Sequence, residues 1–217
     1  METVIYFIRH AQSLPKAYID RSDWFDCPLS ELGENQARHL ADIICHLHIA
    51  HVISSPYIRC IHTIKPFIET YKIPMTIHND LREKHISPSF IEESYEIWVK
   101  SWEDFHFKIP GCESSFEAQD RFVKSVKDIS LLHQGKTIAV ITHGDVLGLF
   151  LNYIDSRNHM EKAEKMRNPD ILRVVHRASR FLWDRDFSAP GLDNIATHRD
   201  QIPLDNWINR DSGRHPK

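Results

Sequence analysis

Short apolar runs alternate with amphipathic segments along most of this chain. Residues 3–8, 51–54 and 137–141 are rich in isoleucine, valine and threonine, and each run is too short for a helix. Runs of this kind are typical of strands buried on both faces of a sheet. Between them, apolar residues recur at intervals of three and four, from Leu32 to Leu47 and from Ile61 to Ile68. That spacing indicates helices packed on a sheet, so the pattern predicts an α/β protein.

The remaining segments carry weaker patterns. Pro74 to His78 is a candidate strand, and Leu14 to Phe25 has no steady period and is expected to cross the surface. Aromatic residues at helical spacing between Ile86 and Phe107 predict a small cap. Basic and apolar residues from Asn158 to Arg185 are spaced as in one or two surface helices, and Asn194 to His198 is expected to form a final strand.

Three serine residues stand where helices are expected to begin. Ser30 precedes two glutamates, whose negative charge suits the first turn of a helix. Ser55 precedes a proline, which is favoured at the first helical position. Ser114 has a glutamate three positions later, which is the spacing of a capping box. The start at Ser55 places Arg59 in the first turn of its helix, where backbone amides favour an anion.

The composition excludes several classes of protein. Hydrophobic residues make up 41% and charged residues 26% of the 217 residues, as in one soluble globular domain. The formal net charge of -3 creates no basic field, so neither nucleic acid nor an anionic membrane is the expected partner. The first apolar run is too short for a signal peptide or a membrane span. Because the four cysteines lack paired spacing, reduced thiols and a cytoplasmic location are expected.

The chain holds 15 histidines, and His46, His48 and His51 lie close together. A metal site is conceivable there, but the segment joins a helix end to a strand start, so the rings need not converge. Neither a carboxylate nor a second cysteine completes a ligand set. Histidines near the end of a helix, where they stabilise its dipole, are the favoured interpretation. No metal or other cofactor is therefore predicted.

Two of the predicted strands end at a histidine. Arg9 and His10 follow the first strand, and His143 follows the strand that ends at residue 141. Gly144 beside it permits a close approach of the backbone. Carboxyl ends of neighbouring parallel strands meet at one edge of a sheet, where ligands bind. Together with Arg59, these residues are therefore expected to line one pocket.

This set of residues suits attack on phosphorus. A neutral imidazole is a nucleophile, and a neighbouring guanidinium attracts phosphate and lowers the pKa of His10 by like-charge repulsion. Arg9 and Arg59 would hold a phosphoryl group between His10 and His143 and stabilise the charge of the transition state, with no metal required. The simpler alternatives are an incidental surface dipeptide at residues 9–10 and a solvated arginine at position 59.

These positions belong to an ordered set of motifs. The motifs are Phe7-Ile8-Arg9-His10-Ala11-Gln12-Ser13; Asp26-Cys27-Pro28-Leu29-Ser30 with Leu32-Gly33 and Gln36-Ala37; Ser54-Ser55-Pro56-Tyr57-Ile58-Arg59 with Thr63; Leu81-Arg82-Glu83; Gly111-Cys112-Glu113-Ser114; and Thr142-His143-Gly144. With these motifs in this order, and over nearly its whole length, the chain resembles the histidine phosphatase superfamily, in its phosphoglycerate mutase-like branch.

The resemblance implies a fold and a set of roles. The fold would be a three-layer α/β/α domain over residues 1–217, with a mixed, mostly parallel central sheet and a cap insertion around residues 86–110. His10 would become phosphohistidine, and Glu83 would be the general acid and then the base, although from sequence alone a surface carboxylate is the simpler interpretation. Phosphoryl contacts would come from Arg9, Arg59 and His143, and further substrate contacts from Ser13, Lys16 and Gly144.

The chain departs from the family pattern at several positions. Ala11 and Gln12 stand where the family often has glycine and glutamate, and Lys16 stands where asparagine is usual. Lys16 would contact a phosphate or carboxylate, or simply be solvated. Mutases tend to carry Glu-Arg-His-Tyr-Gly around the acid, whereas this chain continues from Glu83 with Lys-His-Ile-Ser. Asp145 would place an anion near the phosphate, and the sequence offers no account of it.

These departures favour a metal-independent phosphomonoester hydrolase. A phosphoglycerate-type mutase is the alternative, and a non-catalytic member of the fold that binds a phosphorylated ligand or a protein is the second. The expected partner is a small phosphorylated substrate, whose identity depends on variable loops and stays open. Assembly as a homodimer also stays open.

Overall fold

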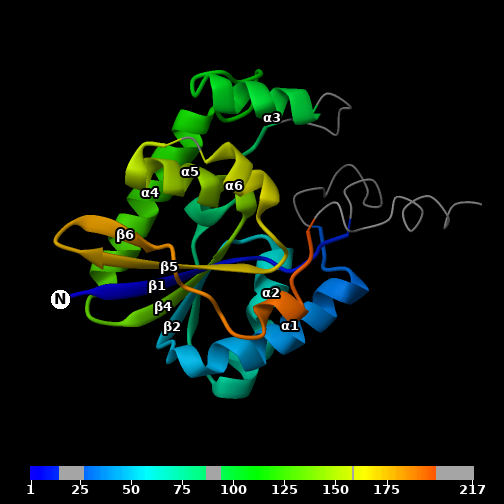
Figure 1. Cartoon of the computed structure of the whole chain (residues 1–217), viewed down its shortest axis with the longest axis vertical. Coiled ribbons are helices and arrows are strands. Elements are labelled where there is room, and N and C mark those ends of the chain that lie inside the picture. The colour runs from blue at the N-terminus through cyan, green and yellow to red at the C-terminus, as the bar shows by residue number, and fades with distance from the viewer. Residues whose placement is uncertain (15–26, 87–93, 158, 199–217) are drawn as a thin grey trace, which may run out of the picture.

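A single six-stranded sheet forms the centre of the computed structural model, which describes residues 1–14, 27–86, 94–157 and 159–198 (Figure 1). The strand order is β3-β2-β4-β1-β5-β6. The strands are β1 (Thr3–Arg9), β2 (His51–Ser54), β3 (Met75–Ile77), β4 (Thr137–Thr142), β5 (Asp170–Arg177) and β6 (Arg180–Asp184). The first four strands pair in parallel, whereas β5 pairs antiparallel with both β1 and β6. The expected mixed, mostly parallel sheet is confirmed.

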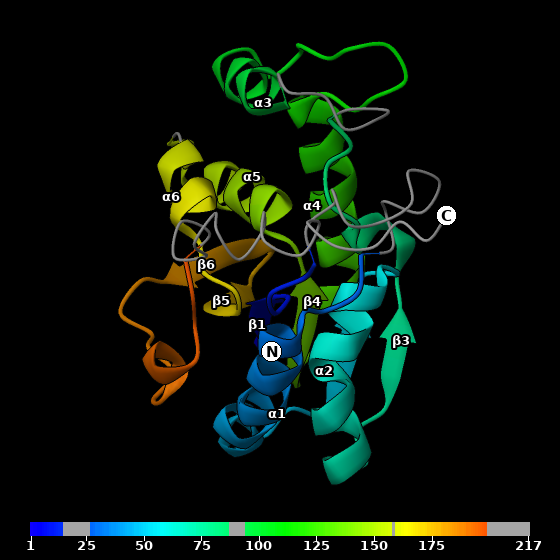
Figure 2. The same ribbon diagram turned by 90° about the vertical axis from the view of Figure 1, so that its right-hand side faces the viewer.

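Helices cover both faces of the sheet, as the two views show (Figures 1 and 2). On one face lie α1 (Glu31–Ile44) and α2 (Ile58–Tyr71), and on the other α4 (Ser115–Leu132) and α5 (Gly144–Asp155). The smaller elements are α3 (Ser94–Glu103), α6 (Met160–Lys165) and the 3-10 turns η3 (Cys45–Leu47), η4 (Asn79–Leu81) and η5 (Leu192–Asn194). The three-layer α/β/α architecture is therefore confirmed.

Each layer of helices buries its own apolar core against the sheet. Phe7 of β1 packs with Phe122 of α4 and Phe150 of α5, whereas Ile8 points to the other face and packs near Ile64 of α2. Full burial of one such side chain contributes about 1.5–3 kcal/mol to stability. Because both faces are covered, neighbouring strand residues are all apolar, and the strands appear in the sequence as continuous apolar runs.

The prediction of one or two helices between residues 158 and 185 is wrong beyond α6. Strands β5 and β6 form an antiparallel hairpin there, with Val175 opposite Leu182. The turn is made by Ala178 and Ser179, whose φ angles are 49° and 61°. Two-residue hairpin turns with positive φ normally contain glycine, asparagine or aspartate. Because neither turn residue is of these types, the sequence carries no hairpin signal at this point.

The predicted final strand at residues 194–198 is also wrong. Only Thr197 pairs, and it does so in an isolated bridge to Asn168. The short η5 turn precedes it, so the chain here is mostly irregular. The segment offers only two adjacent apolar residues, Ile195 and Ala196, between polar ones. Such a pattern is too short to distinguish a strand from a single bridge.

Two of the three predicted helix starts are confirmed. Ser30 caps α1 by accepting a hydrogen bond from the backbone N–H of Gly33, and Ser114 forms the predicted capping box with Glu117. Helix α2 begins three residues after Ser55, so that serine is not its N-cap. Arg59 nevertheless lies in the first turn of α2, as predicted.

Some expectations concern residues outside the described ranges. Lys16 and nearly all of the predicted surface excursion, at residues 15–26, lie there, as do residues 87–93 of the predicted cap. The rest of the cap segment contains α3, which lies beyond the sheet near the start of α4 (Figure 2). The four cysteines, all among the described residues, form no disulfide. Within the described part of the chain, no helix has both the length and the apolar character needed to cross a bilayer.

Candidate active site

His10, Arg59 and His143 meet at the carboxyl edge of the sheet. His10 directly follows β1, His143 lies between β4 and α5, and Arg59 is in the first turn of α2. The ring centroids of the two histidines are 5.3 Å apart. Arg59 bridges them, with its Nε 3.2 Å from Nε2 of His10 and its Nη2 3.2 Å from Nδ1 of His143. The structure therefore brings together residues that lie on three separate segments of the sequence.

Hydrogen bonding determines which ring nitrogen of His10 carries the proton. Nδ1 lies 2.7 Å from the carbonyl oxygen of Ala11, which can only accept, so Nδ1 is the donor. Nε2 in turn accepts from the Nε–H of Arg59. The lone pair of the neutral ring is therefore on Nε2, beside the guanidinium group.

His143 has the opposite arrangement of donor and acceptor. Its Nδ1 accepts from Arg59, so its Nε2 carries the hydrogen and donates to the buried hydroxyl of Ser55 at 2.8 Å. The Tyr57 ring lies 4.6 Å from Cζ of Arg59 and 5.1 Å from the His143 ring. The sequence argument gave neither Ser55 nor Tyr57 a role in the site. Ser55 precedes a proline, and a serine at such a position is first interpreted as a helix cap.

Burial and nearby cations keep both imidazoles neutral. Burial lowers the pKa of His10 well below its usual value, and the charges of Arg59 and Arg9 lower it further. Burial likewise lowers the pKa of His143, with Arg59 as the next cause. A neutral ring retains the lone pair that a nucleophile needs. The sequence argument identified the charge repulsion and missed burial, which is the larger cause.

Arg9 lies against the first residue of α5. Its Nη1 donates to the carbonyl oxygen of Met166. A Cβ atom on Gly144 would lie 3.1 Å from both Cζ and Nε of Arg9. That distance is shorter than the roughly 3.5–4.0 Å of an ordinary carbon contact. Gly144 therefore makes room for the guanidinium group, while its predicted contact with substrate stays a prediction.

Glu83 reaches the N-terminus of α5 from the segment after η4. Its carboxyl group accepts from the backbone N–H groups of Lys84 at 3.0 Å, Asp145 at 3.2 Å and Val146 at 3.0 Å. The first N–H groups of a helix have no partner within the helix and lie at its positive end, so they suit a carboxylate. The predicted acid is therefore held by residues that follow His143 by two and three positions.

The surroundings of Glu83 favour a carboxyl group that can hold a proton. Burial raises its pKa, the charge of Asp145 raises it further, and the three N–H groups offset part of this increase. Arg121 of α4 supports the backbone, because its Nη2 donates to the carbonyl oxygen of Glu83 at 3.1 Å. The same guanidinium binds Glu113 at 2.6 and 2.8 Å. A raised pKa is what a general acid near neutrality requires.

Thr63 supports the backbone on both sides of the histidine pair. Its hydroxyl accepts from the backbone N–H of Ala11 at 2.9 Å and donates to the carbonyl oxygen of Arg59 at 2.6 Å. One buried hydroxyl thus joins the residue after His10 to the first turn of α2. In the sequence, the feature that indicates this supporting role is a threonine on the apolar face of a predicted helix.

Asn168 and Gln36 provide a second support, to which the sequence argument gave no role. Nδ2 of Asn168 donates to the carbonyl oxygen of His10 at 2.7 Å. The Gln36 amide accepts from the backbone N–H of Gln12 at 2.9 Å and donates to the carbonyl oxygen of Asn168 at 2.8 Å. Gln36 is buried where the helical spacing called for an apolar residue, and such a polar side chain usually completes backbone hydrogen bonds.

The remaining predicted site residues are placed as follows. Ser13 pairs with Leu29 in an isolated bridge, and Lys16 lies outside the described residues, so contacts of either with substrate stay predictions. Asp145 is engaged on the side of α3, where it accepts from the indole Nε1 of Trp98 and of Trp102, each at 2.8 Å. The carboxylate that the sequence left unexplained therefore has its own partners.

No group of three or more histidine, cysteine, aspartate or glutamate side chains is arranged to hold a metal ion among the residues described here. His51, one of the three clustered histidines, hydrogen-bonds to Thr76 at 2.9 Å. Cys60 lies 3.5 Å from Nε2 of His143, but burial raises the pKa of its thiol to about 12. The thiol therefore stays protonated and is a poor nucleophile.

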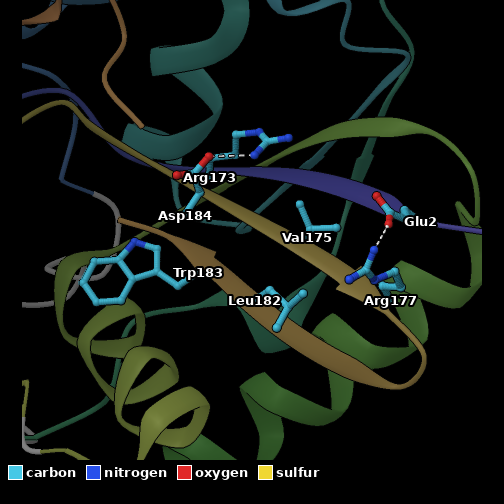
Figure 3. Close-up of a pocket in the computed structure, with 7 residues that line it drawn as sticks. All are labelled: Glu2, Arg173, Val175, Arg177, Leu182, Trp183 and Asp184. Atoms are coloured by element: carbon cyan, nitrogen blue, oxygen red, sulfur yellow. Dashed lines mark hydrogen bonds and ion pairs between the residues drawn. The ribbon is translucent and has the colours of Figure 1, made fainter. Parts of the chain in front are cut away.

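Two surface hollows lie elsewhere on the molecule. One, on β5 and β6, is crossed by ion pairs of 2.7 Å between Arg173 and Asp184 and 2.8 Å between Arg177 and Glu2 (Figure 3). The other adjoins it and extends to Arg167. Neither hollow includes a residue of the histidine pair or of its arginines.

Known proteins resemble this chain in both sequence and fold. The model of the histidine phosphatase superfamily (branch 1) matches residues 5–185. A protein described as probable phosphoglycerate mutase GpmB, from Serratia proteamaculans, is 28% identical over 189 residues, which cover 82% of this chain and 87% of that protein. Mycobacterial glucosyl-3-phosphoglycerate phosphatase has a TM-score of 0.69 at 17% identity, over 85% of this chain and 98% of that one. Phosphoglycerate mutase from Bacillus anthracis has a TM-score of 0.69 at 17% identity, over 89% of this chain and 95% of that one. With the family match extending over most of its length, the chain belongs to the histidine phosphatase superfamily.

Proposed function

We propose that this protein is a metal-independent phosphomonoester hydrolase that transfers a phosphoryl group first to His10 and then to water. The observation that carries the proposal is the unprotonated Nε2 of His10 beside the guanidinium of Arg59. A lone pair next to a fixed cation favours attack on the phosphorus of an anionic ester. Membership of a family whose relatives include phosphatases and mutases supports phosphoryl transfer.

In the first step, Nε2 of His10 attacks phosphorus and the bond from phosphorus to the leaving oxygen breaks. The carboxyl proton of Glu83 moves to that oxygen, so the alcohol departs as a neutral molecule. Arg59 exchanges its contact with His10 for the phosphoryl oxygens, which Arg9 also binds, while His143, held by Arg59 and Ser55, lines the site beside them. These fixed cations and donors stabilise the charge that develops on the phosphoryl group.

In the second step, the Glu83 carboxylate takes a proton from a water molecule whose oxygen attacks phosphorus. The bond between phosphorus and Nε2 breaks, inorganic phosphate leaves, and Glu83 is protonated again. The three backbone N–H groups support the carboxylate form, whereas burial favours the carboxylic acid. This balance suits a group that must be acid and base in turn.

Trapping the intermediate tests the mechanism. A rapidly quenched reaction with a ³²P-labelled phosphomonoester is expected to leave label on His10 that is stable in base and lost in acid. His10→Ala should lose both label and turnover, whereas His39→Ala, which changes an exposed histidine of α1, should keep both. Turnover by the unchanged protein without any histidine-linked label would contradict the mechanism.

Chelation tests the proposed independence from metals. Turnover should be the same before and after dialysis against EDTA, since positive charge at the site comes from guanidinium groups. A loss that added Mg²⁺ or Zn²⁺ restores would exclude this part of the proposal.

A phosphoglycerate-type mutase is the second candidate, because the curated relatives carry that description. With 3-phosphoglycerate as substrate, isomerisation faster than release of inorganic phosphate would favour the mutase. Tight vanadate binding without turnover across a broad panel of esters would favour a non-catalytic phosphate-binding protein. The substrate class, a small phosphorylated molecule, and the cytoplasmic location stay predictions.

A further inference from the structure

A lysine and an aspartate beside Glu83 form a buried ion pair. Nζ of Lys84 lies 2.9 Å from a carboxylate oxygen of Asp145, and the side chains are 0% and 11% exposed. Nζ also donates to the hydroxyls of Ser101 at 2.8 Å and Ser115 at 3.0 Å. The ammonium group therefore makes two hydrogen bonds to hydroxyls besides its ion pair with Asp145. Removing one member of such a pair leaves the other charge buried without its counterpart.

The same ion pair is tied to α3. The second carboxylate oxygen of Asp145 accepts from the indole N–H groups of Trp98 and Trp102, each at 2.8 Å. Ser101, which accepts from Lys84, lies between these tryptophans in α3. The helix in the predicted cap segment is thus hydrogen-bonded to both members of the pair.

The backbone of the two charged residues binds the carboxyl group of Glu83. The N–H of Lys84 donates to its Oε1 and the N–H of Asp145 donates to its Oε2. The side-chain ion pair joins the two residues whose N–H groups hold the two carboxyl oxygens. The ion pair therefore links the two segments that supply these donors.

We propose that Lys84 and Asp145 are positioning residues for Glu83, and that their ion pair, anchored by α3, holds the carboxyl group where it can protonate the leaving oxygen. This inference rests on the proposed function, because Glu83 is the acid of that mechanism. A bare carboxyl group in a loop would be free to rotate, and loss of about 1 Å of alignment can reduce a rate by about 10²-fold.

Removing the charge of Asp145 and removing the charge of Lys84 should move the alkaline limb of the pH profile of kcat/KM in opposite directions. The titratable and charged groups that face Glu83 are Tyr57 and Cys60 from the side of α2, Arg121 from α4, Asp145 from α5 and Lys84 beside it. Burial raises the pKa of both the Tyr57 phenol and the Cys60 thiol, so these two groups stay neutral.

Each substitution leaves one charge behind. Asp145→Asn leaves the ammonium group of Lys84, which favours the carboxylate form of Glu83. The alkaline limb, along which activity is lost, should therefore move to lower pH. Lys84→Met leaves the Asp145 carboxylate, which favours the protonated acid, so activity persists to higher pH. An opposite charge favours the ionised carboxyl group and a like charge favours the protonated one, so the alkaline limb of Asp145→Asn should lie at lower pH than that of Lys84→Met. The double variant should fall near the unchanged protein.

Two substrates distinguish positioning of the acid from a general structural defect. Glycerol 2-phosphate has a poor leaving group that needs a proton, whereas 4-nitrophenyl phosphate releases a stable phenolate that needs little help. Asp145→Asn should lower kcat/KM for glycerol 2-phosphate by at least about tenfold while changing the aryl ester much less. Trp98→Phe, which removes one indole donor and keeps an aromatic ring, should show the same selectivity in a protein that still folds.

The exposed pair of Lys124 and Asp120 on α4 supplies the matched control. Lys124→Met and Asp120→Asn should change neither the pH limb nor the ratio between the two esters. If Glu83→Gln shows no selective loss with glycerol 2-phosphate, the proposed function fails. If Glu83→Gln shows that loss but the folded Asp145→Asn, Lys84→Met and Trp98→Phe variants do not, the positioning proposal alone is overturned.

Discussion

Replacing Thr63 by valine tests the support behind His10, the proposed nucleophile. The two side chains have nearly the same shape, but valine lacks the hydroxyl that accepts from Ala11 N–H and donates to the carbonyl oxygen of Arg59. Thr63 is 1% exposed and Ala11 0%, so water cannot replace the lost contacts. The carbonyl oxygen of Arg59 keeps its bond within α2, which leaves the Ala11 N–H as the unsatisfied group.

The size of the effect follows from that one donor. A buried N–H without an acceptor costs about 1–3 kcal/mol, so Thr63→Val should lower the free energy of unfolding by about 2 kcal/mol. With a urea dependence of about 2 kcal/mol per molar, the midpoint should fall by about 1 M. Ala11 directly follows His10, so kcat/KM should also fall by about tenfold or more.

Urea unfolding and steady-state kinetics measure the two effects. Thr63→Ser keeps the hydroxyl and removes one methyl group, so it should cost only about 1 kcal/mol and leave kcat/KM nearly unchanged. If valine and serine at this position gave the same midpoint and the same kcat/KM, the hydroxyl would have no supporting role.

Three further predictions concern the same site. Gly144→Ala should raise KM by a few-fold, because its Cβ, 3.1 Å from Cζ of Arg9, shifts the guanidinium group slightly away from the phosphoryl oxygens that it would bind; an unchanged KM would contradict this contact. Ser55→Ala should lower kcat/KM by a similar factor, since the Nε2–H of His143 loses its acceptor, and equal rates would argue against the assigned ring protonation. In the folded protein, the pKa values of His10 and His143 lie below those of the same residues in the unfolded chain. As the pH falls through about 6.5, the unfolded state therefore binds more protons than the folded state and becomes more favourable. The urea midpoint should decrease from pH 7 to pH 5, and a constant midpoint would refute neutral buried rings.

Much of the fold follows from local patterns that the structure keeps. Buried strands gave continuous apolar runs, and the capping box at Ser114 marked the start of α4 within one residue. His10 and His143 could be placed together because each ends a strand and parallel strands have their carboxyl ends at one edge. These features depend on a few neighbouring residues, so they are visible in sequence.

The errors arise where distant contacts decide. A turn made by Ala178 and Ser179 has no residue suited to positive φ, so the β5–β6 hairpin depends on its pairing with β1. Ser55 has the local features of a helix cap, yet its hydroxyl accepts from His143. Asp145 was unexplained because its partners, in α3 and in the segment after Glu83, lie far from it in the chain.

The support of His10 by Asn168 has a consequence for biosynthesis. His10 leaves the ribosome long before Asn168, whose amide holds its carbonyl oxygen, and Thr197, which binds the backbone of Asn168, follows later still. Contacts so distant in the chain close only after most of the domain has been made. A growing polypeptide therefore carries the His10 imidazole long before the site around it is complete, so under the proposed function an unfinished copy should not hydrolyse phosphoesters.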